Sequence, residues 1–352
     1  MTGSGDRNPP FDLAAYARVK ANWDAVAKPL DGMGCFEEIL CRIGALHGTD
    51  EIDIRRRAVI VMCADNGIVA EGVSQSGSEV TRTVAEWLGR GESSVCRLAA
   101  GNGTDVLPVD IGIASEDTPE GVLPRKIAQG TKDFLLGPAM TEEECAAAIR
   151  TGRELVRDCK TQGYRILATG EMGIGNTTTS AAVAAALLQL TPDEVTGAGA
   201  GLPPEGIERK KQVIREGLAR YAERLDSPLE VLRCLGGLDL AGLTGIFLGG
   251  AQEGIPIVID GLISAAAALL AERIAPGTRR CMIASHLGKE PALRKLMASL
   301  GLAPVIHAEL ALGEGTGAVM LLSLLDLACL LYREGTRFKG SPVQAYQRFS
   351  RA

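Results

Sequence analysis

Residues that bind metals or form disulfide frameworks are scarce in this sequence. The 352 residues include three histidines, and the nine cysteines are scattered without a CxxC pair. Zinc sites and disulfide-rich scaffolds need such residues at short, regular spacings. The sequence therefore predicts no metal site and no disulfides, and its unpaired cysteines are typical of a cytosolic protein.

Long blocks of one charge are absent as well. The 37 basic and 43 acidic residues are interspersed and give a net charge of -6. A surface that binds nucleic acid or an anionic membrane usually carries a cluster of lysine and arginine. We therefore expect no nucleic-acid partner.

Uninterrupted apolar stretches long enough for a membrane span are also lacking. The most apolar stretches are residues 181–190, 255–271 and 316–331; the first is too short, and the others contain Asp260 and Asp326. Residues 1–10 are polar and glycine-rich and lack the apolar centre of a signal peptide. The sequence thus predicts buried strands and helices of a globular core, no membrane span and a cytoplasmic location.

What the sequence does contain is an alternation of short apolar runs with helical segments. Strands are predicted at residues 57–64, 105–111, 164–168, 257–260 and 281–285, with Pro108 near a sheet edge. Helices are predicted at residues 11–50 (with a break at 28–34), 78–89, 93–99, 141–162, 181–190, 205–225, 229–235, 239–249, 263–274, 291–300 and 316–333. The fold class is α/β, a parallel Rossmann-like sheet with helices on both faces. Ligands bind at the carboxyl ends of such strands, which here carry Asp65, Glu171, Asp260 and Ser285-His286.

A glycine-rich loop, residues 170–180 (GEMGIGNTTTS), lies between a predicted strand and a predicted helix. We expect Asn176 or Thr177 to be the N-cap of that helix. Backbone N–H groups at such a turn favour an anion, and phosphate is the natural ligand. Gly170 to Gly175 has Walker A spacing, but Asn176 replaces the lysine that a β- or γ-phosphate needs. A monophosphate therefore fits better than a nucleoside triphosphate, and a tight turn without a ligand is the alternative.

A second glycine run, residues 197–201 (GAGAG), is not GxGxxG and follows no clear strand, which argues against a dinucleotide site. It could be a plain flexible loop. Lys210, a short distance further on, could supply positive charge to a phosphate or lie on a solvated helix face.

A lone carboxylate, Glu314, lies between glycines in residues 312–317 (LGEGTG), ahead of an apolar helix. The glycines let a ligand come close, so Glu314 is a candidate general base, although it could only complement the helix dipole. Glu171 is a second candidate carboxylate. Asp260 could orient a sugar hydroxyl or cap its own helix, and we expect structural roles for His286 and His307.

Taken together, these segments resemble the nicotinate-nucleotide–dimethylbenzimidazole phosphoribosyltransferase family, which acts in assembly of the cobalamin nucleotide loop. The resemblance rests on residues 171–178 and 312–317 and, in the family's order over roughly residues 25–330, on 28–34, 64–67, 71–74, 130–131, 137–141, 236–239, 260–261 and 285–286. It implies a small helical domain of residues 1–50 with 335–352, a large α/β domain of residues 51–334, and a homodimer without a cofactor. The implied reaction moves the phosphoribosyl group of nicotinate mononucleotide onto 5,6-dimethylbenzimidazole, with inversion of the anomeric carbon.

The resemblance also implies roles for individual residues. Glu314 matches the catalytic base, and Ser74, Glu171 and Leu312 would lie near the accepting base. The 5′-phosphate and ribose would be held by Gly173, Ile174, Gly175, Asn176, Thr177, Gly199, Gly201, Lys210 and Asp260.

Some positions depart from the family pattern and concern the identity of the accepted base. The usual histidine after Asp65 is Asn66, and a glutamine expected after Ser74 has no counterpart at Arg82 or Thr83. Ala200, Ala292, Leu293 and Ala311 also replace the usual residues. The alternatives are therefore an enzyme of the same fold that uses another benzimidazole, adenine or a phenol, and a non-catalytic nucleotide-binding protein. A nicotinamide dehydrogenase would need the missing GxGxxG.

Overall fold

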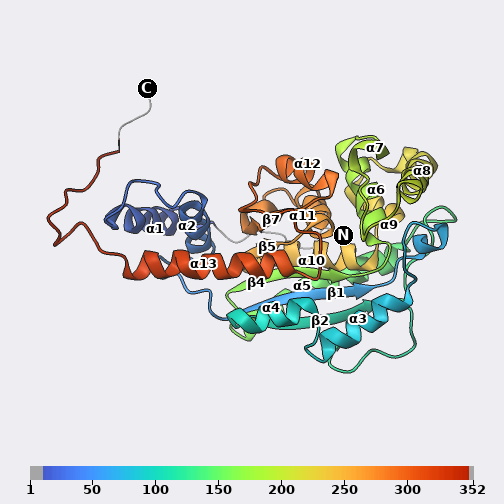
Figure 1. Cartoon of the computed structure of the whole chain (residues 1–352), viewed down its shortest axis with the longest axis horizontal. Helices are drawn as coiled ribbons and strands as arrows, with labels where there is room; N and C mark the ends of the chain where they lie inside the picture. The colour runs from blue at the N-terminus through green and yellow to red at the C-terminus, as the bar shows by residue number, and fades with distance from the viewer. Residues whose placement is uncertain (1–10, 349–352) are drawn as a thin grey trace.

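The computed structural model describes residues 11–348, in which six parallel strands form one sheet with helices on both faces (Figure 1). The strand order is β3-β2-β1-β4-β5-β6. The strands are β1 (Arg57–Ala64), β2 (Asp105–Gly112), β3 (Leu123–Pro124), β4 (Ile166–Met172), β5 (Ile257–Ile259) and β6 (Met282–Ala284). Because the order reverses between β1 and β4, their carboxyl ends border the crevice where ligands bind in such sheets. The predicted fold class is confirmed.

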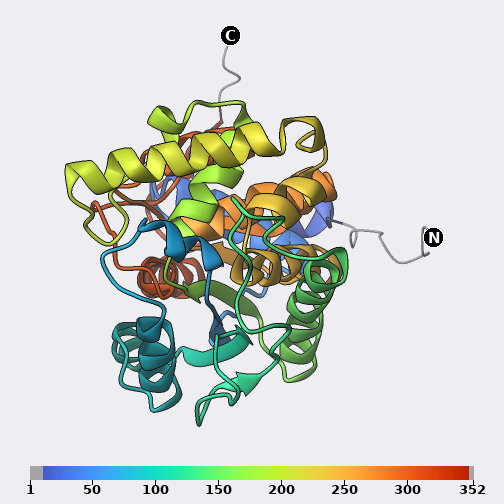
Figure 2. The same ribbon diagram turned by 90° about the vertical axis from the view of Figure 1, so that its right-hand side faces the viewer.

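Strand β1 is buried on both faces because its side chains alternate between two apolar cores. Ile60 and Met62 belong to one core, and Val59 and Val61 belong to the other. The first core is covered by α5 (Glu142–Thr161), α6 (Asn176–Leu188), α7 (Pro192–Val195), α8 (Pro204–Arg220), α9 (Pro228–Leu235), α10 (Leu238–Glu253), α11 (Leu262–Ile274) and α12 (Pro291–Leu300). The second is covered by α1 (Leu13–Ala25), α2 (Cys35–His47), α3 (Glu79–Gly89), α4 (Ser94–Asn102) and α13 (Thr316–Glu334). Figure 2 shows α8 lying across α6 as an outer layer.

Most elements begin and end close to the predicted residues, and their local signals explain why. The capping box expected at Thr141 is present: its Oγ1 accepts from the Glu144 N–H at 3.1 Å, and its own N–H donates to the Glu144 carboxylate at 2.7 Å. Pro108 lies where β2 has only β1 beside it, since β3 pairs with Val109 and Asp110. Pro108 thus lies on a stretch of β2 that is at the sheet edge, as expected, and proline is tolerated at such edges.

Other boundaries differ from the prediction. The expectation that Asn176 or Thr177 is the N-cap of α6 is wrong, because α6 begins at Asn176 and Gly175, with φ 92°, is the N-cap. The predicted helix 205–225 ends early, and η2 (Ala222–Arg224) follows it. Several elements of two to five residues were not predicted, because a segment that short shows no hydrophobic periodicity. They are η1 (Gly67–Glu71), η3 (Thr278–Cys281), β3, α7, and the pair β7 (His286–Leu287) and β8 (Ile306–His307).

The two ends of the described chain meet beside the carboxyl-terminal half of α13 (Figure 1). The rings of Trp23 and Tyr332 lie 5.1 Å apart, and Val26 pairs with Arg337 in an isolated antiparallel bridge. The division into a small domain (1–50 with 335–352) and a large one (51–334) stays a prediction. Residues 1–10, on which the signal-peptide argument rests, and 349–352 lie outside the described residues.

By length and composition alone, α13 is the one helix in residues 11–348 that could cross a membrane, although the sequence argues against a span there because of Asp326. More than half of its most apolar window, 56%, is buried inside the protein. Its side chains pack into the second core described above, through Ala318, Leu321, Leu322 and Leu325. This is typical of the core helix of a globular domain.

Candidate active site

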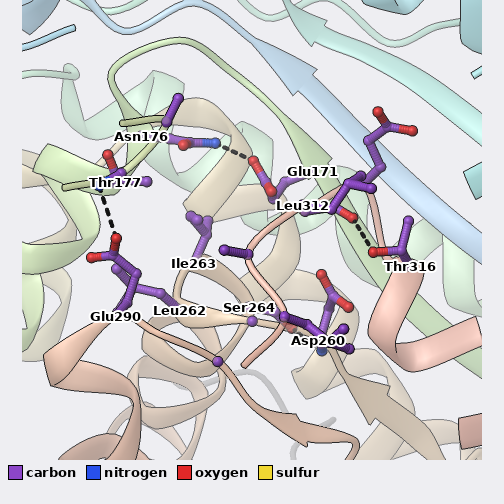
Figure 3. A pocket seen from close by; sticks show the side chains of 18 of the residues that line it. Glu171, Asn176, Thr177, Asp260, Leu262, Ile263, Ser264, Glu290, Leu312 and Thr316 are labelled. Atoms are coloured by element: carbon purple, nitrogen blue, oxygen red, sulfur yellow. Dashed lines mark hydrogen bonds between the residues drawn. The ribbon is translucent and has the colours of Figure 1, made fainter. Parts of the chain in front are cut away.

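A cavity of about 250 Å³ opens at the carboxyl ends of β4, β5 and β6 (Figure 3). Its walls come from parts of residues 171–177, 199–200, 260–264, 286–293 and 310–316. Thr177 and Glu290 lie at one end of the pocket, and Asp260 and Thr316 lie at the other (Figure 3). The pocket is therefore elongated enough to give a ligand two different chemical environments.

The end of the pocket at Thr177 is built for an anion. Thr177 follows Gly175 at the first turn of α6, where backbone N–H groups and the helix dipole favour negative charge. Lys210 on α8 is fully buried, and its Nζ donates to Thr177 Oγ1 at 2.8 Å. No carboxylate among the described residues forms a salt bridge with it. Burial lowers the pKa of Lys210 to about 8, and the charge of Glu290 opposes this shift, so an anion at this end would restore its positive charge.

The second glycine run is tied to this end by Glu290, the N-cap of α12. Glu290 Oε1 accepts from the Gly199 N–H at 2.9 Å. A Cβ atom on Gly197 would lie 2.2 Å from Glu290 Oε2, and one on Gly199 would lie 3.4 Å from Lys210 Nζ. The run is therefore packed between Glu290 and Lys210, and its glycines permit the close approach.

Glu314 occupies a strained turn directly before α13. Its φ of 58° is in the left-handed region, which non-glycine residues rarely adopt. The Val95 N–H, in the first turn of α4, donates to Glu314 Oε2 at 3.0 Å. Backbone strain of this kind is frequent at functional sites. The N-terminus of α4 therefore faces the Glu314 carboxylate, which belongs to the pocket wall.

Glu171 and Asp239 share one amide. Nδ2 of Asn176 donates to Glu171 Oε2, a bond that Figure 3 draws as a dashed line. The same nitrogen donates to Asp239 Oδ2 at 3.1 Å. Burial raises the pKa of Glu171 to about 8; the bond from Asn176 opposes this rise, and the charges of Asp239, Asp260 and Glu314 add to it. Burial likewise raises the pKa of Asp239 to about 6, against the donors that surround it.

Asp260 links β5 to α13. Its Oδ1 accepts from the Ala318 N–H at 3.0 Å, whereas α11, the helix that follows Asp260, has Gly261 as N-cap and no side-chain cap. The alternative that Asp260 caps its own helix is therefore wrong, because it caps α13 instead. Burial raises its pKa, and the nearby His286, 3.9 Å from Oδ1, acts against that shift. Asp260 thus helps to fix the loop that carries Glu314.

Most of the predicted site residues come together in this pocket. Its wall contains Glu171, Gly173, Ile174, Asn176, Thr177, Gly199, Asp260, Leu312 and Glu314. Four predicted site residues are not part of the wall: Gly175, Gly201, Lys210 and Ser74. Lys210 contacts the wall residue Thr177 by a hydrogen bond. Gln75, which follows Ser74, donates a hydrogen bond to the Gly201 carbonyl.

Other residues of the pocket were not predicted as site residues. Those with polar or charged side chains are Ser264, His286, Lys289, Glu290 and Thr316 in the wall, with Asp239 behind Asn176. His286 was placed at a ligand-binding strand end by the sequence, but a structural role was expected for it; it follows β6 and lies in the pocket wall. Glu290 gave no signal, since its partner Gly199 is far away in the sequence.

Comparisons with known proteins place this geometry in a family. A phosphoribosyltransferase family model matches residues 8–343. The chain belongs to this phosphoribosyltransferase family. Its relatives include the nicotinate-nucleotide–dimethylbenzimidazole phosphoribosyltransferases of Thermus thermophilus, 42% identical over 93% of this chain and 97% of the relative, and of Clostridium acetobutylicum, 38% identical over 96% of each.

Solved structures of this phosphoribosyltransferase family have the same fold. The crystal structure of CobT from Thermus thermophilus is 41% identical in sequence and superposes with a TM-score of 0.88, over 94% of this chain and 99% of that one. A second crystal structure, of the nicotinate-nucleotide–dimethylbenzimidazole phosphoribosyltransferase of the same organism, gives a TM-score of 0.86 at 41% identity over 93% and 98%. The resemblance inferred from the sequence motifs is confirmed.

Proposed function

We propose that this phosphoribosyltransferase moves the phosphoribosyl group of nicotinate mononucleotide onto 5,6-dimethylbenzimidazole. The products are α-ribazole 5′-phosphate, with the anomeric carbon inverted, and free nicotinate. The observation that carries the proposal is the two-ended pocket: a buried lysine without a described carboxylate partner lies beyond Thr177, and carboxyl groups surround the other end. The name of the relatives supports the choice of both substrates.

The 5′-phosphate would bind at the end formed by the first turn of α6, Gly199 and Lys210. Two of these partners suit a single phosphate: the helix N-terminus favours an anion, and Lys210 offers a charge that no described carboxylate neutralises by direct contact. The Gly199 N–H donates to Glu290 and would have to exchange that bond for one to the phosphate. Holding the phosphate fixes the ribose, so positioning supplies much of the catalysis. Asp260 lies toward the opposite end, where a ribose hydroxyl could accept or donate a bond.

Glu314 would act as general base. The incoming benzimidazole nitrogen attacks the anomeric carbon as the bond from that carbon to nicotinate breaks, and the electron pair of the broken bond returns to the pyridine ring. Nicotinate leaves from a cationic pyridinium and needs no proton. The N–H of the attached benzimidazole must be lost, and the Glu314 carboxylate, held by the Val95 N–H, accepts that proton. The accepted base would contact Glu171 and Leu312 in the pocket wall, where Leu312 is 56% exposed. Ser74 lies outside the wall and would have to approach the base on binding.

We further infer a cytoplasmic homodimer. All nine cysteines are free thiols, as in a reducing compartment. Leu327, Leu330 and Met320 expose 63%, 45% and 40% of their surfaces on α13, and exposed apolar side chains on one helix favour a protein interface. A mass near twice 36.9 kDa in sedimentation equilibrium is expected; a monomer at micromolar concentration would contradict the dimer.

A competition assay tests the reaction. Nicotinate mononucleotide is supplied with equal amounts of 5,6-dimethylbenzimidazole, unsubstituted benzimidazole, adenine and a phenol, and products are identified by mass and anomeric configuration. We expect α-ribazole 5′-phosphate to dominate. If dimethylbenzimidazole is among the poorest acceptors, the assigned acceptor is wrong. If no acceptor consumes the nucleotide while it still binds, the non-catalytic alternative replaces the proposal.

A further inference from the structure

The side chain of Asn176 connects the pocket to a carboxylate that lies outside it. Its single amide nitrogen donates to Glu171 in the pocket wall and to Asp239 on α10 behind the wall. Asp239 is fully buried. Backbone packs closely on both of its oxygens: a Cβ atom on Gly173 would lie 2.8 Å from Asp239 Oδ2, and one on Gly237 would lie 2.5 Å from Oδ1.

Two carboxyl groups on one amide nitrogen are too close for both to ionise easily in a low-dielectric site. The hydrogen-bond donors decide which of them holds the negative charge. Asp239 receives the Leu240 N–H at 2.9 Å in addition to Asn176, and the Asn66 side chain also bonds to it. Among the described residues, Glu171 has Asn176 as its one donor, and its Oε1 lies against Gly313. The charge therefore stays on Asp239 and the proton on Glu171.

We propose that Asp239 is a positioning residue for Glu171, because through the amide of Asn176 it holds the Glu171 carboxyl group in one orientation at the pocket wall and in its protonated form. The charges that act most on Glu171 are those of Asp239 from α10, Asp260 after β5 and Glu314 before α13, and all three are acidic. The buried thiol of Cys63 on β1 also interacts with Glu171, and Lys289 and Glu290 line the same pocket. Burial and these charges raise the pKa of Glu171 to about 8, in agreement with the hydrogen-bond pattern.

The consequence for catalysis rests on the proposed function. Nicotinate mononucleotide carries a phosphate and a carboxylate, and an ionised Glu171 would add another negative charge to a wall that already contains Asp260, Glu290 and Glu314. A neutral Glu171 removes that repulsion and offers an O–H donor at a fixed position. Asp239 would thus act on substrate binding without touching the substrate.

The first test needs no substrate and so does not depend on the proposed reaction. The carbonyl stretch of a protonated carboxylic acid is followed by infrared spectroscopy against pH, and Glu171→Gln identifies the Glu171 band. In Asp239→Asn, which keeps the shape and an acceptor for Asn176, we expect the titration midpoint of that band to fall by roughly one to three pH units. Asp226→Asn, which removes an exposed charge outside the pocket wall, should not move it. An unchanged midpoint in Asp239→Asn would overturn the proposal.

The second test separates charge from orientation by steady-state kinetics. At neutral pH, Asp239→Asn should raise the KM for nicotinate mononucleotide several-fold with little loss of kcat, and lower pH should restore the KM as Glu171 regains its proton. Asp239→Ala also frees Asn176 and should lower kcat as well. A KM defect in Asp239→Asn that does not depend on pH would overturn the electrostatic role, and equal kcat losses in both variants would overturn the orienting role. If Asp239→Ala does not fold, the pH-dependent KM of Asp239→Asn decides.

Discussion

The main chain of Gly170 lies directly against the carbonyl group of Glu314. A Cβ atom on Gly170 would be 2.3 Å from the Glu314 oxygen and 3.1 Å from the Gly315 nitrogen. Gly170 is still part of β4, so it is not a phosphate-loop residue, although it is the first glycine of the Walker-like spacing. Its role is to let the loop that carries Glu314 approach the sheet.

Gly170→Ala is therefore expected to damage activity more than stability. The added methyl group meets backbone atoms that cannot rotate away, and overpacking of this kind costs about 1–3 kcal/mol. A displacement of Glu314 by about 1 Å could lower kcat by roughly a hundredfold. Urea unfolding and initial rates measure the two effects. Gly101→Ala in α4, where nothing lies within 4 Å of the new Cβ atom, is the control and should keep full activity. Full activity of Gly170→Ala would contradict the close approach.

Glu314→Gln tests the general base. The amide keeps the size of the side chain and can still accept from the Val95 N–H, so nicotinate mononucleotide should bind nearly as before. Turnover should fall by roughly two to four decades, the usual contribution of a general base. Glu309→Gln, an exposed residue of the same connection that is outside the pocket wall, should turn over normally. Unchanged turnover of Glu314→Gln would remove Glu314 from its role.

The fold was largely predictable because its signals are local. The apolar run from Arg57 to Ala64 ends at Asp65, and the run before Glu171 ends in glycines, so both strand ends could be placed at the same edge of a parallel sheet. The N-cap of α6 could not be predicted from residue preferences, because Gly175 takes a left-handed conformation where the usual choice would be a polar cap.

The site was predictable only where its residues end strands or lie between glycines. Glu171, Asp260 and Glu314 have such positions. Glu290 contacts Gly199, and Asp239 contacts Asn176, only because α12 and α10 pack beside α6. These contacts join residues far apart in the sequence, and no spacing rule connects them. Lys210 shows the same limit: the sequence left open whether it faced solvent, and the fold buries it.

Lys210→Met should weaken binding of nicotinate mononucleotide roughly ten- to a hundredfold, the effect of losing a hydrogen bond from a charged group. Its stability should be unchanged or higher, because an apolar side chain replaces a buried amine. The pKa of about 8 means that Lys210 loses its charge as the pH rises past that value. The affinity of the wild type for nicotinate mononucleotide should therefore fall above about pH 8, and the loss caused by Lys210 should be missing in the variant. Isothermal titration calorimetry measures the affinity and its dependence on pH, and urea unfolding measures the stability. Lys211→Met, whose wild-type lysine pairs with Asp193 and Glu208, is the control and should bind normally.

His47 should make the fold sensitive to acid. Its Nε2 bonds to the Arg165 carbonyl at 2.9 Å, and its buried Nδ1 has no hydrogen-bond partner among the described residues. Burial and the Arg165 charge lower the pKa of His47 to about 4. Because the unfolded imidazole has a pKa of about 6.5, the unfolded state binds more protons between these values, and stability falls as the pH falls. We expect a loss of about 2 kcal/mol in the free energy of unfolding at about pH 5 relative to about pH 7.5. Urea unfolding of His47→Gln should show a smaller loss over this range, whereas His307→Gln, at an exposed site, should follow the wild type. Equal acid sensitivity of His47→Gln and the wild type would contradict the assignment.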